Sequence, residues 1–174
     1  MGPVAGPTNT QFAVAVHVLT YLSVMGEQRP VSSDELSAST NTNPVYVRRV
    51  LGPLREAGLV RARQGSQGGW QLARPAEGIG LDEVWAILQA GEPVLGLHGP
   101  NPECPVGFGI QQALGGLDGA VVAAVRAELG RRSVADLVRE ADTAARRRQR
   151  RERRAGGRGA GARAATTRRS PSVS

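Results

Sequence analysis

The sequence contains one cysteine, Cys104, and no lysine, since all 22 of its basic residues are arginine. A single cysteine cannot form a disulfide within the chain, which excludes a disulfide-stapled secreted scaffold. Aromatic residues make up 3% of the chain against 40% hydrophobic residues, so a core must be aliphatic. The N-terminal residues lack the basic segment and apolar run of a signal peptide, and we find no run approaching the ~18 apolar residues of a membrane span. We therefore expect a cytoplasmic protein that does not bind a membrane.

The net charge of +7 is distributed unevenly along the chain. Residues 1–142 hold 11 arginines against 14 acidic residues, a net −3, whereas residues 143–174 hold 11 arginines against Glu152 alone, a net +10. The Arg, Gly, Ala and Ser composition of this last segment is typical of a disordered basic tail. The tail either adds nonspecific phosphate contacts or is a solubilising extension, and the folded body is mildly acidic.

Capping signals and hydrophobic spacing predict three helices in the first part of the chain. The first covers residues 9–26, and the second begins after Ser32, which forms a capping box with Glu35. Asn43 suits the N-cap of a third helix and Pro44 its first position. The apolar stripe of this third helix consists of Val47, Val50, Leu51 and Leu54.

A hairpin is predicted to follow the third helix. Pro53 indicates a kink in that helix, and Gly58 is expected to be its C-cap. Two strands over residues 59–64 and 70–73 flank the glycine-rich segment 65–69, which can adopt the positive φ values of a hairpin tip. A capped helix followed by such a hairpin is the order found in a winged helix.

The rest of the chain is predicted to be helical, with one irregular loop. A fourth helix covers residues 81–88, a proline-rich loop covers residues 91–105, and an apolar helical region with two glycine breaks starts at residue 106. Ser133 is expected to cap a last helix. The apolar face of this region is longer than one small domain needs, which favours a homodimer. The fold class is therefore mainly α with a small β-hairpin wing, a winged helix-turn-helix plus long C-terminal dimerisation helices.

Taken together over residues 8–140, these pieces resemble the Rrf-type (Rrf-two) family of winged helix-turn-helix transcriptional regulators. The matching segments are His17-Val18-Leu19, Asn43-Pro44 with Tyr46, Leu54-Arg55-Glu56-Ala57-Gly58-Leu59-Val60, Gly68-Gly69, Leu72-Ala73-Arg74-Pro75, Ile79-Gly80-Leu81-Asp82-Glu83-Val84 and Ser133-Val134-Ala135-Asp136-Leu137. The family's cluster-binding members have three cysteines before the long helix, whereas this chain has Cys104 alone. The resemblance is therefore to the cluster-free branch, with no cofactor expected.

The resemblance implies a division of the chain into five segments. They are a flexible N-terminus (1–8), a winged helix-turn-helix DNA-binding domain (9–90), a sensor or linker loop (91–105), dimerisation helices (106–142) and a disordered Arg-rich tail (143–174). The second helix of such a domain enters the major groove of double-stranded DNA. The residues expected to contact DNA are Thr42, Asn43, Tyr46, Arg48, Arg49 and Arg55 on the helix, and Gln64, Ser66, Gln67, Gly68 and Gly69 on the wing.

Arg48 is expected to read a base, because a bidentate arginine–guanine pair contributes ~1–3 kcal/mol of discrimination. Tyr46 and Arg55 are expected to hold backbone phosphates, which position the protein without specifying sequence. The plainer alternative is a solvated helix face on which the arginines pair with Glu56 or Asp34. For the wing, the alternative is an ordinary tight hairpin whose glycines serve the turn alone.

Cys104 is a candidate redox sensor because it precedes a predicted helix start, where a thiolate is favoured. It would form a sulfenic acid or a disulfide with the same residue of a second subunit. Glu103 opposes this by disfavouring the anion, and the alternative is a small buried apolar residue. His17 is expected in the core or an interface, and His98 with Cys104 provides too few ligands for a metal site.

The sequence therefore predicts a DNA-binding regulator and not an enzyme, since no catalytic arrangement of Ser, Cys and His has supporting context. A homodimeric repressor released by a small-molecule or oxidant effector is the leading hypothesis. One alternative is a small-molecule-binding sensory module without operator specificity, with its pocket near Trp85. Another is nonspecific coating of nucleic acid by the tail alone.

Overall fold

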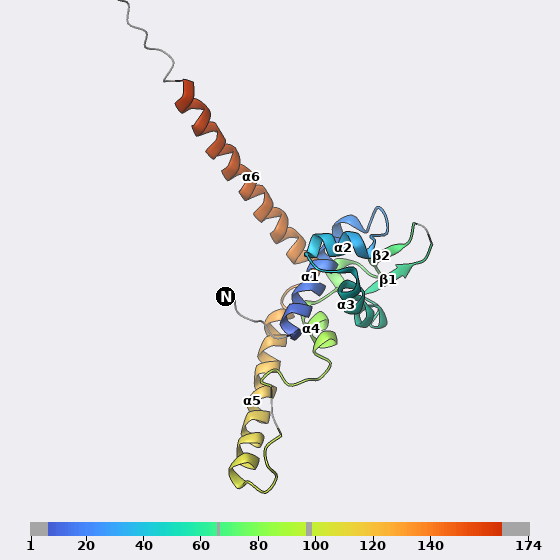
Figure 1. Cartoon of the computed structure of the whole chain (residues 1–174), viewed down its shortest axis with the longest axis vertical. Helices are drawn as coiled ribbons and strands as arrows, with labels where there is room; N and C mark the ends of the chain where they lie inside the picture. The colour runs from blue at the N-terminus through green and yellow to red at the C-terminus, as the bar shows by residue number, and fades with distance from the viewer. Residues whose placement is uncertain (1–6, 66, 97–98, 165–174) are drawn as a thin grey trace, which may run out of the picture. The chain divides into compact units, whose positions relative to one another are not determined.

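A computed structural model of the chain describes residues 7–65, 67–96 and 99–164. The chain forms two compact units, residues 1–138 and residues 139–174. In chain order the elements are α1 (Pro7–Met25), α2 (Ser33–Thr40), α3 (Pro44–Glu56), β1 (Val60–Arg63), β2 (Gly69–Leu72), the short 3-10 helix η1 (Ala76–Gly78), α4 (Leu81–Gln89), α5 (Pro105–Leu129) and α6 (Val134–Ala164). The mainly helical fold with one β-hairpin is confirmed (Figure 1).

One aliphatic core lies among the elements of the first unit. Helix α1 packs against α2, α3 and α4, and α3 also packs against α2, α4 and β1. The largest fully buried side chains are Leu19, Leu22, Leu36, Leu51, Leu54, Leu59, Ile79, Val18, Val31, Val47, Val50 and Val60. All of them are Leu, Ile or Val, as the low aromatic content requires.

Helices α2 and α3 begin and end as their capping residues dictate. The Ser32 hydroxyl accepts a hydrogen bond from the backbone N–H of Glu35 at 3.1 Å, which satisfies a donor that the helix itself cannot. At the other end of α3 the C-cap is Ala57, and Gly58 follows it with φ +73°. Gly58, which was predicted to be the C-cap, is therefore the residue after the C-cap, in the left-handed position of a Schellman motif. Pro53 lies inside the helix, as expected.

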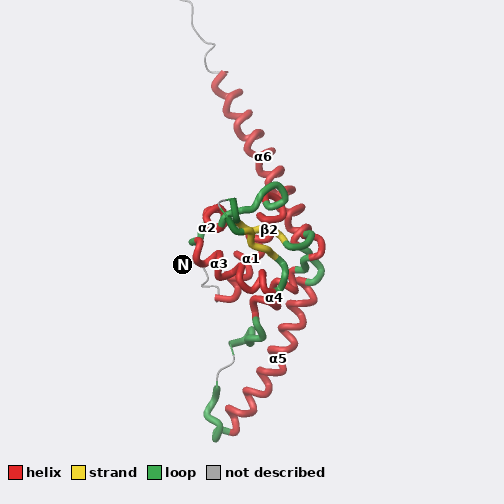
Figure 2. Tube along the Cα trace, turned by 90° about the vertical axis from the view of Figure 1, so that its right-hand side faces the viewer, coloured by secondary structure: helices red, strands yellow, loops and turns green. Residues whose placement is uncertain are grey.

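The wing is an antiparallel pair in which Val60 faces Leu72 and Arg63 faces Gly69. Its strand β2 is also joined to the loop before α2. The backbones of Val31 and Trp70 exchange two hydrogen bonds, of 3.0 and 2.8 Å. The Trp70 indole N–H donates to the Ser33 hydroxyl at 3.1 Å. These contacts fix the base of the wing to the helix-turn-helix (Figure 2).

Helix α5 is continuous, although two glycine breaks were expected. None of its residues is buried, and it packs on α4. By length and composition it is apolar enough to cross a membrane, so the expectation that no window approaches this limit was wrong. Glycine and alanine separate its larger apolar side chains, which hides the pattern from a search for unbroken runs. A single helix of this kind is weak evidence for a span, and α5 carries Gln111, Gln112 and Asp118 in its middle.

Helix α6 begins in the first unit and ends in the second. Ser133 and Asp136 form a reciprocal cap, in which the Ser133 N–H donates to the Asp136 carboxylate at 2.8 Å and the Asp136 N–H donates to the Ser133 hydroxyl at 3.2 Å. Val134 and Ala135 are buried. The helix then runs to Ala164, where an unstructured tail was expected from residue 143. Arg, Ala, Gln and Glu are strong helix formers, which explains the helix over residues 144–155; residues 156–164 include four glycines, which composition does not explain.

Candidate nucleic-acid interface

Helix α3 has one buried face and one exposed face. Val47, Val50, Leu51 and Leu54 are all 0% exposed, as the spacing of the stripe predicts. Because the stripe fixes the rotation of the helix, Arg48, Arg49 and Arg55 are exposed to solvent. Arg48 and Arg55 are seven residues apart and share one edge of this face.

The three arginines of α3 have no hydrogen-bond or ion-pair partner among the described residues. The alternative of pairing with Glu56 or Asp34 is therefore not what the structure contains. Unpaired guanidinium groups on one helix face are available to carboxylates or phosphates, which they bind through parallel N–H donors.

The residues at the start of α3 combine structural and surface roles. Asn43 Oδ1 accepts from the Tyr46 N–H at 2.8 Å, so this side chain caps the helix. The Thr42 and Thr40 hydroxyls are 2.8 Å apart. Tyr46 is half-buried against the core, so less of its ring than expected is free for a ligand. The exposed edge of this turn presents Asn43 and Val45 instead.

The glycines of the wing are required by close packing. A Cβ on Gly68 would lie 2.3 Å from the Arg63 carbonyl oxygen, and one on Gly69 would lie 2.6 Å from the Val31 carbonyl oxygen. The hairpin interpretation therefore accounts for both glycines without any ligand. Of the wing side chains that the sequence predicted, Gln64 and Gln67 are exposed and remain available to a ligand. The remaining expected wing residue, Ser66, lies outside the described residues.

Positive charge is concentrated in α3 and the wing. Residues 43–72 hold five arginines and one acidic residue, a net +4, although residues 1–142 together carry −3. The remainder of the body is therefore −7. A basic segment in an acidic body concentrates the attraction for a polyanion at one surface.

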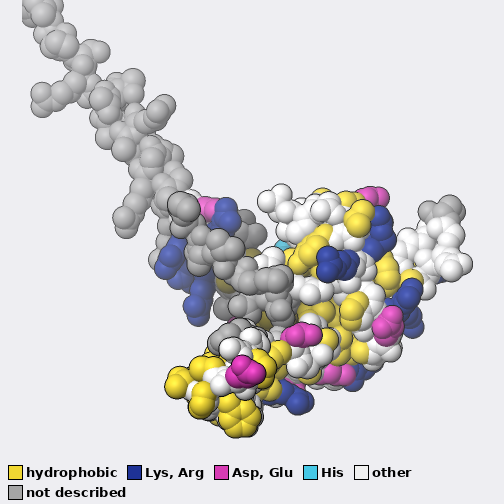
Figure 3. Space-filling model, turned by 60° about the horizontal axis from the view of Figure 1, so that its bottom comes forward, with side chains coloured by type: hydrophobic (Ala, Val, Ile, Leu, Met, Phe, Trp, Pro, Cys, Tyr) yellow, Lys and Arg dark blue, Asp and Glu magenta, His cyan; other side chains and the backbone are white. Residues whose placement is uncertain are grey.

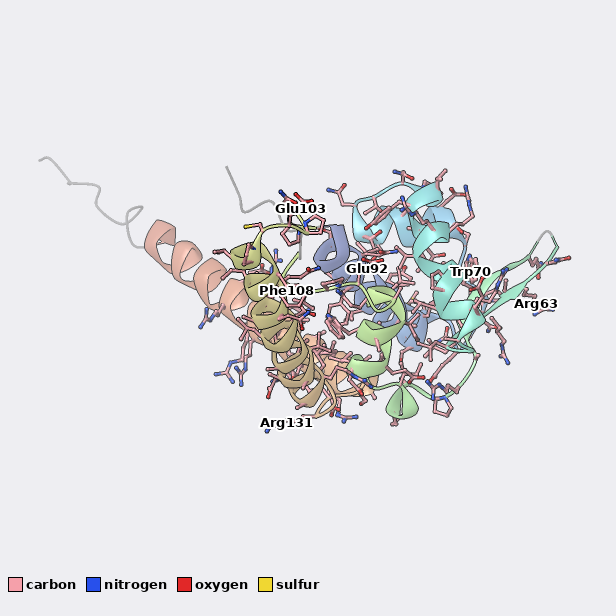
Figure 4. The ribbon with its side chains drawn as sticks, turned by 90° about the horizontal axis from the view of Figure 1, so that it is seen from below. Arg63, Trp70, Glu92, Glu103, Phe108 and Arg131 are labelled. Carbon is pink, nitrogen blue, oxygen red and sulfur yellow. The ribbon has the colours of Figure 1, made fainter. Side chains whose placement is uncertain are left out.

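Three exposed residues belong to this surface but were not among the expected contacts. Arg61 and Arg63 are two positions apart on β1, so they share one face of the strand. Figure 4 shows Arg63 on the hairpin, further out than Trp70. Val45 is 69% exposed on α3, and an apolar side chain there suits the methyl group of thymine. Strand alternation and the rotation of the α3 stripe are the signals that identify them.

A polar cluster braces α2 beside the wing. Arg29 donates to both carboxylate oxygens of Glu35 at 2.8 Å, and the Tyr21 hydroxyl donates to Oε1 at 2.9 Å. The hydrogen bonds from Arg29 lower the pKa of Glu35. The hydrogen bond to Glu35 raises the pKa of Tyr21. This cluster holds the first helix of the helix-turn-helix pair against α1.

Cys104 is the N-cap of α5, and its sulfur accepts from the Gly107 N–H at 3.4 Å. Its side chain is half-buried. His17 is exposed, with Nε2 3.1 Å from the Ser39 hydroxyl, so a place in the core is wrong. His98 lies outside the described residues, and within those residues no group of three His, Cys, Asp or Glu is placed to hold a metal.

A small cavity lies between α4 and α5 in the first unit. Its volume is about 220 Å³. Its lining residues are Trp85, Ala86, Gln89, Gly91, Glu92, Asp118, Val122 and Arg126. The buried Gln89 donates to the Glu92 carbonyl at 2.6 Å, and Asp118 accepts from the Leu95 N–H at 2.8 Å. The residues around the cavity thus connect the loop after α4 to α5.

A buried aliphatic stripe, an exposed cationic recognition face and an anchored wing define a winged helix-turn-helix DNA-binding protein. Residues 8–140 match the family described as Rrf2, iron-dependent transcriptional regulator. An HTH-type transcriptional regulator named YwnA from Bacillus subtilis (strain 168) is 37% identical over 131 residues, which cover 75% of this chain and 96% of the relative. This chain belongs to the Rrf2 family of transcriptional regulators, and is not an enzyme.

Solved structures agree with this assignment at the level of the fold. A transcriptional regulator from Lactobacillus plantarum has a TM-score of 0.65 at 27% identity, covering 76% of this chain and 89% of that one. The structure titled CymR, the global cysteine regulator of B. subtilis, has a TM-score of 0.55 at 19% identity, covering 80% and 98%.

The iron in the family description does not fit the donor set of this chain. Iron–sulfur clusters are held by cysteine thiolates, usually four. The sequence contains Cys104 alone, and this cysteine already caps α5. We therefore derive no step through iron or a cluster.

Proposed function

We propose that this protein is a cytoplasmic, nucleoid-associated repressor that binds a pseudo-palindromic operator as a homodimer. The proposal rests on one observation: α3 exposes three arginines that have no partner among the described residues, and the neighbouring wing is also positively charged. Two α3 helices in successive major grooves would lie about 34 Å apart, one turn of DNA. A signal that changes this spacing releases the operator.

Each residue of the surface has a distinct role in this proposal. Arg48 lies near the N-terminal end of α3, where recognition helices meet base edges, and reads a guanine. Arg55, Arg61 and Arg63 hold phosphates. Thr42, Asn43, Tyr46 and Arg49 complete the helix contact, and Gln64, Ser66 and Gln67 follow the neighbouring groove from the wing. Gly68 and Gly69 act by shaping the hairpin.

Helix α5 supplies the homodimer contact. Val106, Ile110 and Leu117 are 73%, 49% and 53% exposed, and their spacing places them on one helix face. Figure 3 shows hydrophobic side chains gathered over the exposed end of α5. A second α5 covers this face, which accounts for the apolar composition of the helix without a membrane.

The signal acts through the region between α4 and α5. The cavity there is close to the loop that leads to Cys104, and either an oxidant at this thiol or a small molecule in the cavity would shift α5. If the protein binds a small molecule but shows no sequence preference on DNA, it is a sensory module instead.

The first test is selection of bound sequences from random duplex DNA by the full chain, under reducing and oxidising conditions. Recovery of one inverted repeat supports the operator-binding dimer. Recovery only when reduced assigns the signal to Cys104, and the Cys104→Ala protein should then bind in both conditions. No enriched sequence contradicts the proposal.

The roles of the arginines are separable with matched substitutions. Arg48→Gln should cost ~1–3 kcal/mol and relax selectivity at one base position. Arg55→Gln should weaken all duplexes alike and lower the log–log salt slope by ~0.9. Arg131→Gln is the control, because Arg131 pairs with Glu128 and lies far from Arg63 in Figure 4. Identical behaviour of Arg48→Gln and Arg131→Gln contradicts base reading by Arg48.

The dimer contact is tested by placing one charge on each face of α5. Leu117→Glu should produce monomers in sedimentation and weaken operator binding. Gln112→Glu, an exposed position away from the Val106–Ile110 face, should leave the dimer intact. A dimer that survives Leu117→Glu assigns the interface elsewhere.

A further inference from the structure

The second unit contains a helix face made almost entirely of arginine. Arg146 and Arg150 are four residues apart, as are Arg147 and Arg151, so the four side chains lie on one face of α6. All four are exposed. Together with Asp142 and Thr143 they line one shallow groove. We call these four residues the arginine face.

The charge of the arginine face is largely uncompensated. Arg146 pairs with Asp142 at 2.9 Å. For Arg147, Arg150 and Arg151 the structure contains no partner within the described part of the chain. The neighbouring Arg148 pairs with Glu152 at 2.9 Å on the opposite side of the helix. Like charges four residues apart oppose the helix, so a bound anion would stabilise it.

The density of charge on this face fits a duplex. Four arginines over five residue steps span about 7.5 Å at ~1.5 Å per residue, which is one positive charge per ~2 Å. Double-stranded DNA carries one negative charge per ~1.7 Å of its axis. A membrane surface fits less well, because interfacial helices have a large apolar face and the residues opposite are Arg148 and Glu152.

We propose that the arginine face of α6 is a second, sequence-independent surface for duplex DNA, separate from the α3 and wing surface. The inference rests on the proposed DNA-binding function and adds a partner surface to it. Arginine contacts to phosphate position a protein on the duplex but carry no sequence information. The arginine face therefore raises affinity for every duplex and leaves the preference for the operator unchanged.

The test compares two full-length variants of equal charge. The face variant is Arg146→Gln/Arg147→Gln/Arg150→Gln/Arg151→Gln. The control is Arg148→Gln/Arg163→Gln/Arg168→Gln/Arg169→Gln, which removes four charges from the opposite face and from nearer the C-terminus. Binding to a scrambled duplex is measured over a range of NaCl concentrations, with thermal unfolding of each variant recorded alongside.

The face variant should lower the log–log salt slope by up to about 3.6 per bound protomer, since each of the four neutralised phosphates contributes about 0.9. A doubling of NaCl would then weaken the original protein up to about twelve-fold more than the variant. The control should change the slope by less than 1. Equal changes in the two variants, or no change in the face variant, overturn the proposal.

Two further measurements separate the outcomes. The ratio of operator to scrambled affinity should be the same in the face variant and the original protein; loss of this ratio would make α6 a reading element and overturn the proposal. If the original protein binds the operator and the scrambled duplex equally well, the proposed function fails. The salt slopes of the two variants then still show whether the arginine face binds duplex DNA. A face variant that loses single-stranded RNA binding but keeps the duplex slope assigns the surface to RNA and also overturns it.

Discussion

Gly69 connects the wing to the helix-turn-helix, and replacing it with alanine tests whether that connection holds the domain together. Its φ is +156°, and a Cβ would lie 2.6, 2.8 and 2.9 Å from the carbonyl oxygen, carbonyl carbon and nitrogen of Val31. All three contacts are with backbone, so a side-chain rotation cannot relieve them. The Val31–Trp70 bridge must open, and its two backbone hydrogen bonds are lost.

The expected cost of Gly69→Ala is about 2–3 kcal/mol, from two backbone hydrogen bonds of roughly 1 kcal/mol each and some strain at the substituted residue. Urea denaturation followed by circular dichroism measures it. Gly78→Ala is the matched control, because nothing lies within 4 Å of its Cβ, and it should change stability by less than ~0.5 kcal/mol.

Equal stability of the two glycine variants would refute the reasoning, since the control has neither the backbone neighbour nor the positive φ of Gly69. Under conditions in which both proteins are folded, Gly69→Ala should also bind DNA more weakly than Gly78→Ala. The physical reason is that the wing, with Arg61 and Arg63, no longer has a fixed position beside α3.

Three other substitutions test separate parts of the domain. Asn43→Ala removes the cap of α3 and should cost ~1 kcal/mol in urea denaturation; an unchanged midpoint would show that the 2.8 Å contact with Tyr46 contributes nothing. Gly115→Ala in the middle of α5 should stabilise the protein by ~0.5–1 kcal/mol, because its Cβ meets nothing within 4 Å, and destabilisation would contradict that geometry. Glu35→Gln should destabilise the protein at pH 7, because only the ionised carboxylate forms an ion pair with Arg29. The difference in the free energy of unfolding between the variant and the original protein should vanish as the pH falls through the lowered pKa of Glu35. A difference that does not depend on pH would exclude the ion pair as its source.

Helix boundaries near α2 and α3 could be predicted because their causes are local. The Ser32 and Asn43 caps each satisfy a backbone N–H three residues away, and the stripe of α3 is contained in thirteen residues. The exposed positions of Arg48 and Arg49 follow from the same stripe. The exposed face of α3, on which the proposed DNA-binding surface lies, could therefore be predicted from a short stretch of sequence.

The remaining features depend on contacts between distant segments or on the absence of contacts. The need for glycine at position 69 arises from Val31, a residue far away in the sequence, so the hairpin pattern alone left its reason open. Nothing local distinguishes a glycine that breaks a helix from one that a helix tolerates, which is why α5 was expected to be interrupted. The exposure of His17 likewise depends on where α1 meets α2.

The two basic regions of the chain differ in a way that bears on how each would bind DNA. The arginines of α3 lie on a helix whose opposite face is fully buried, so the core fixes the backbone that carries them, and donors on a fixed backbone can discriminate between bases. Those of α6 belong to the second unit, where the described side chains past Val138 are all exposed, and donors without packing on the opposite helix face can respond only to charge. In the two proposals the same residue type would therefore make a specific contact in the first unit and a nonspecific one in the second, and the difference would come from packing.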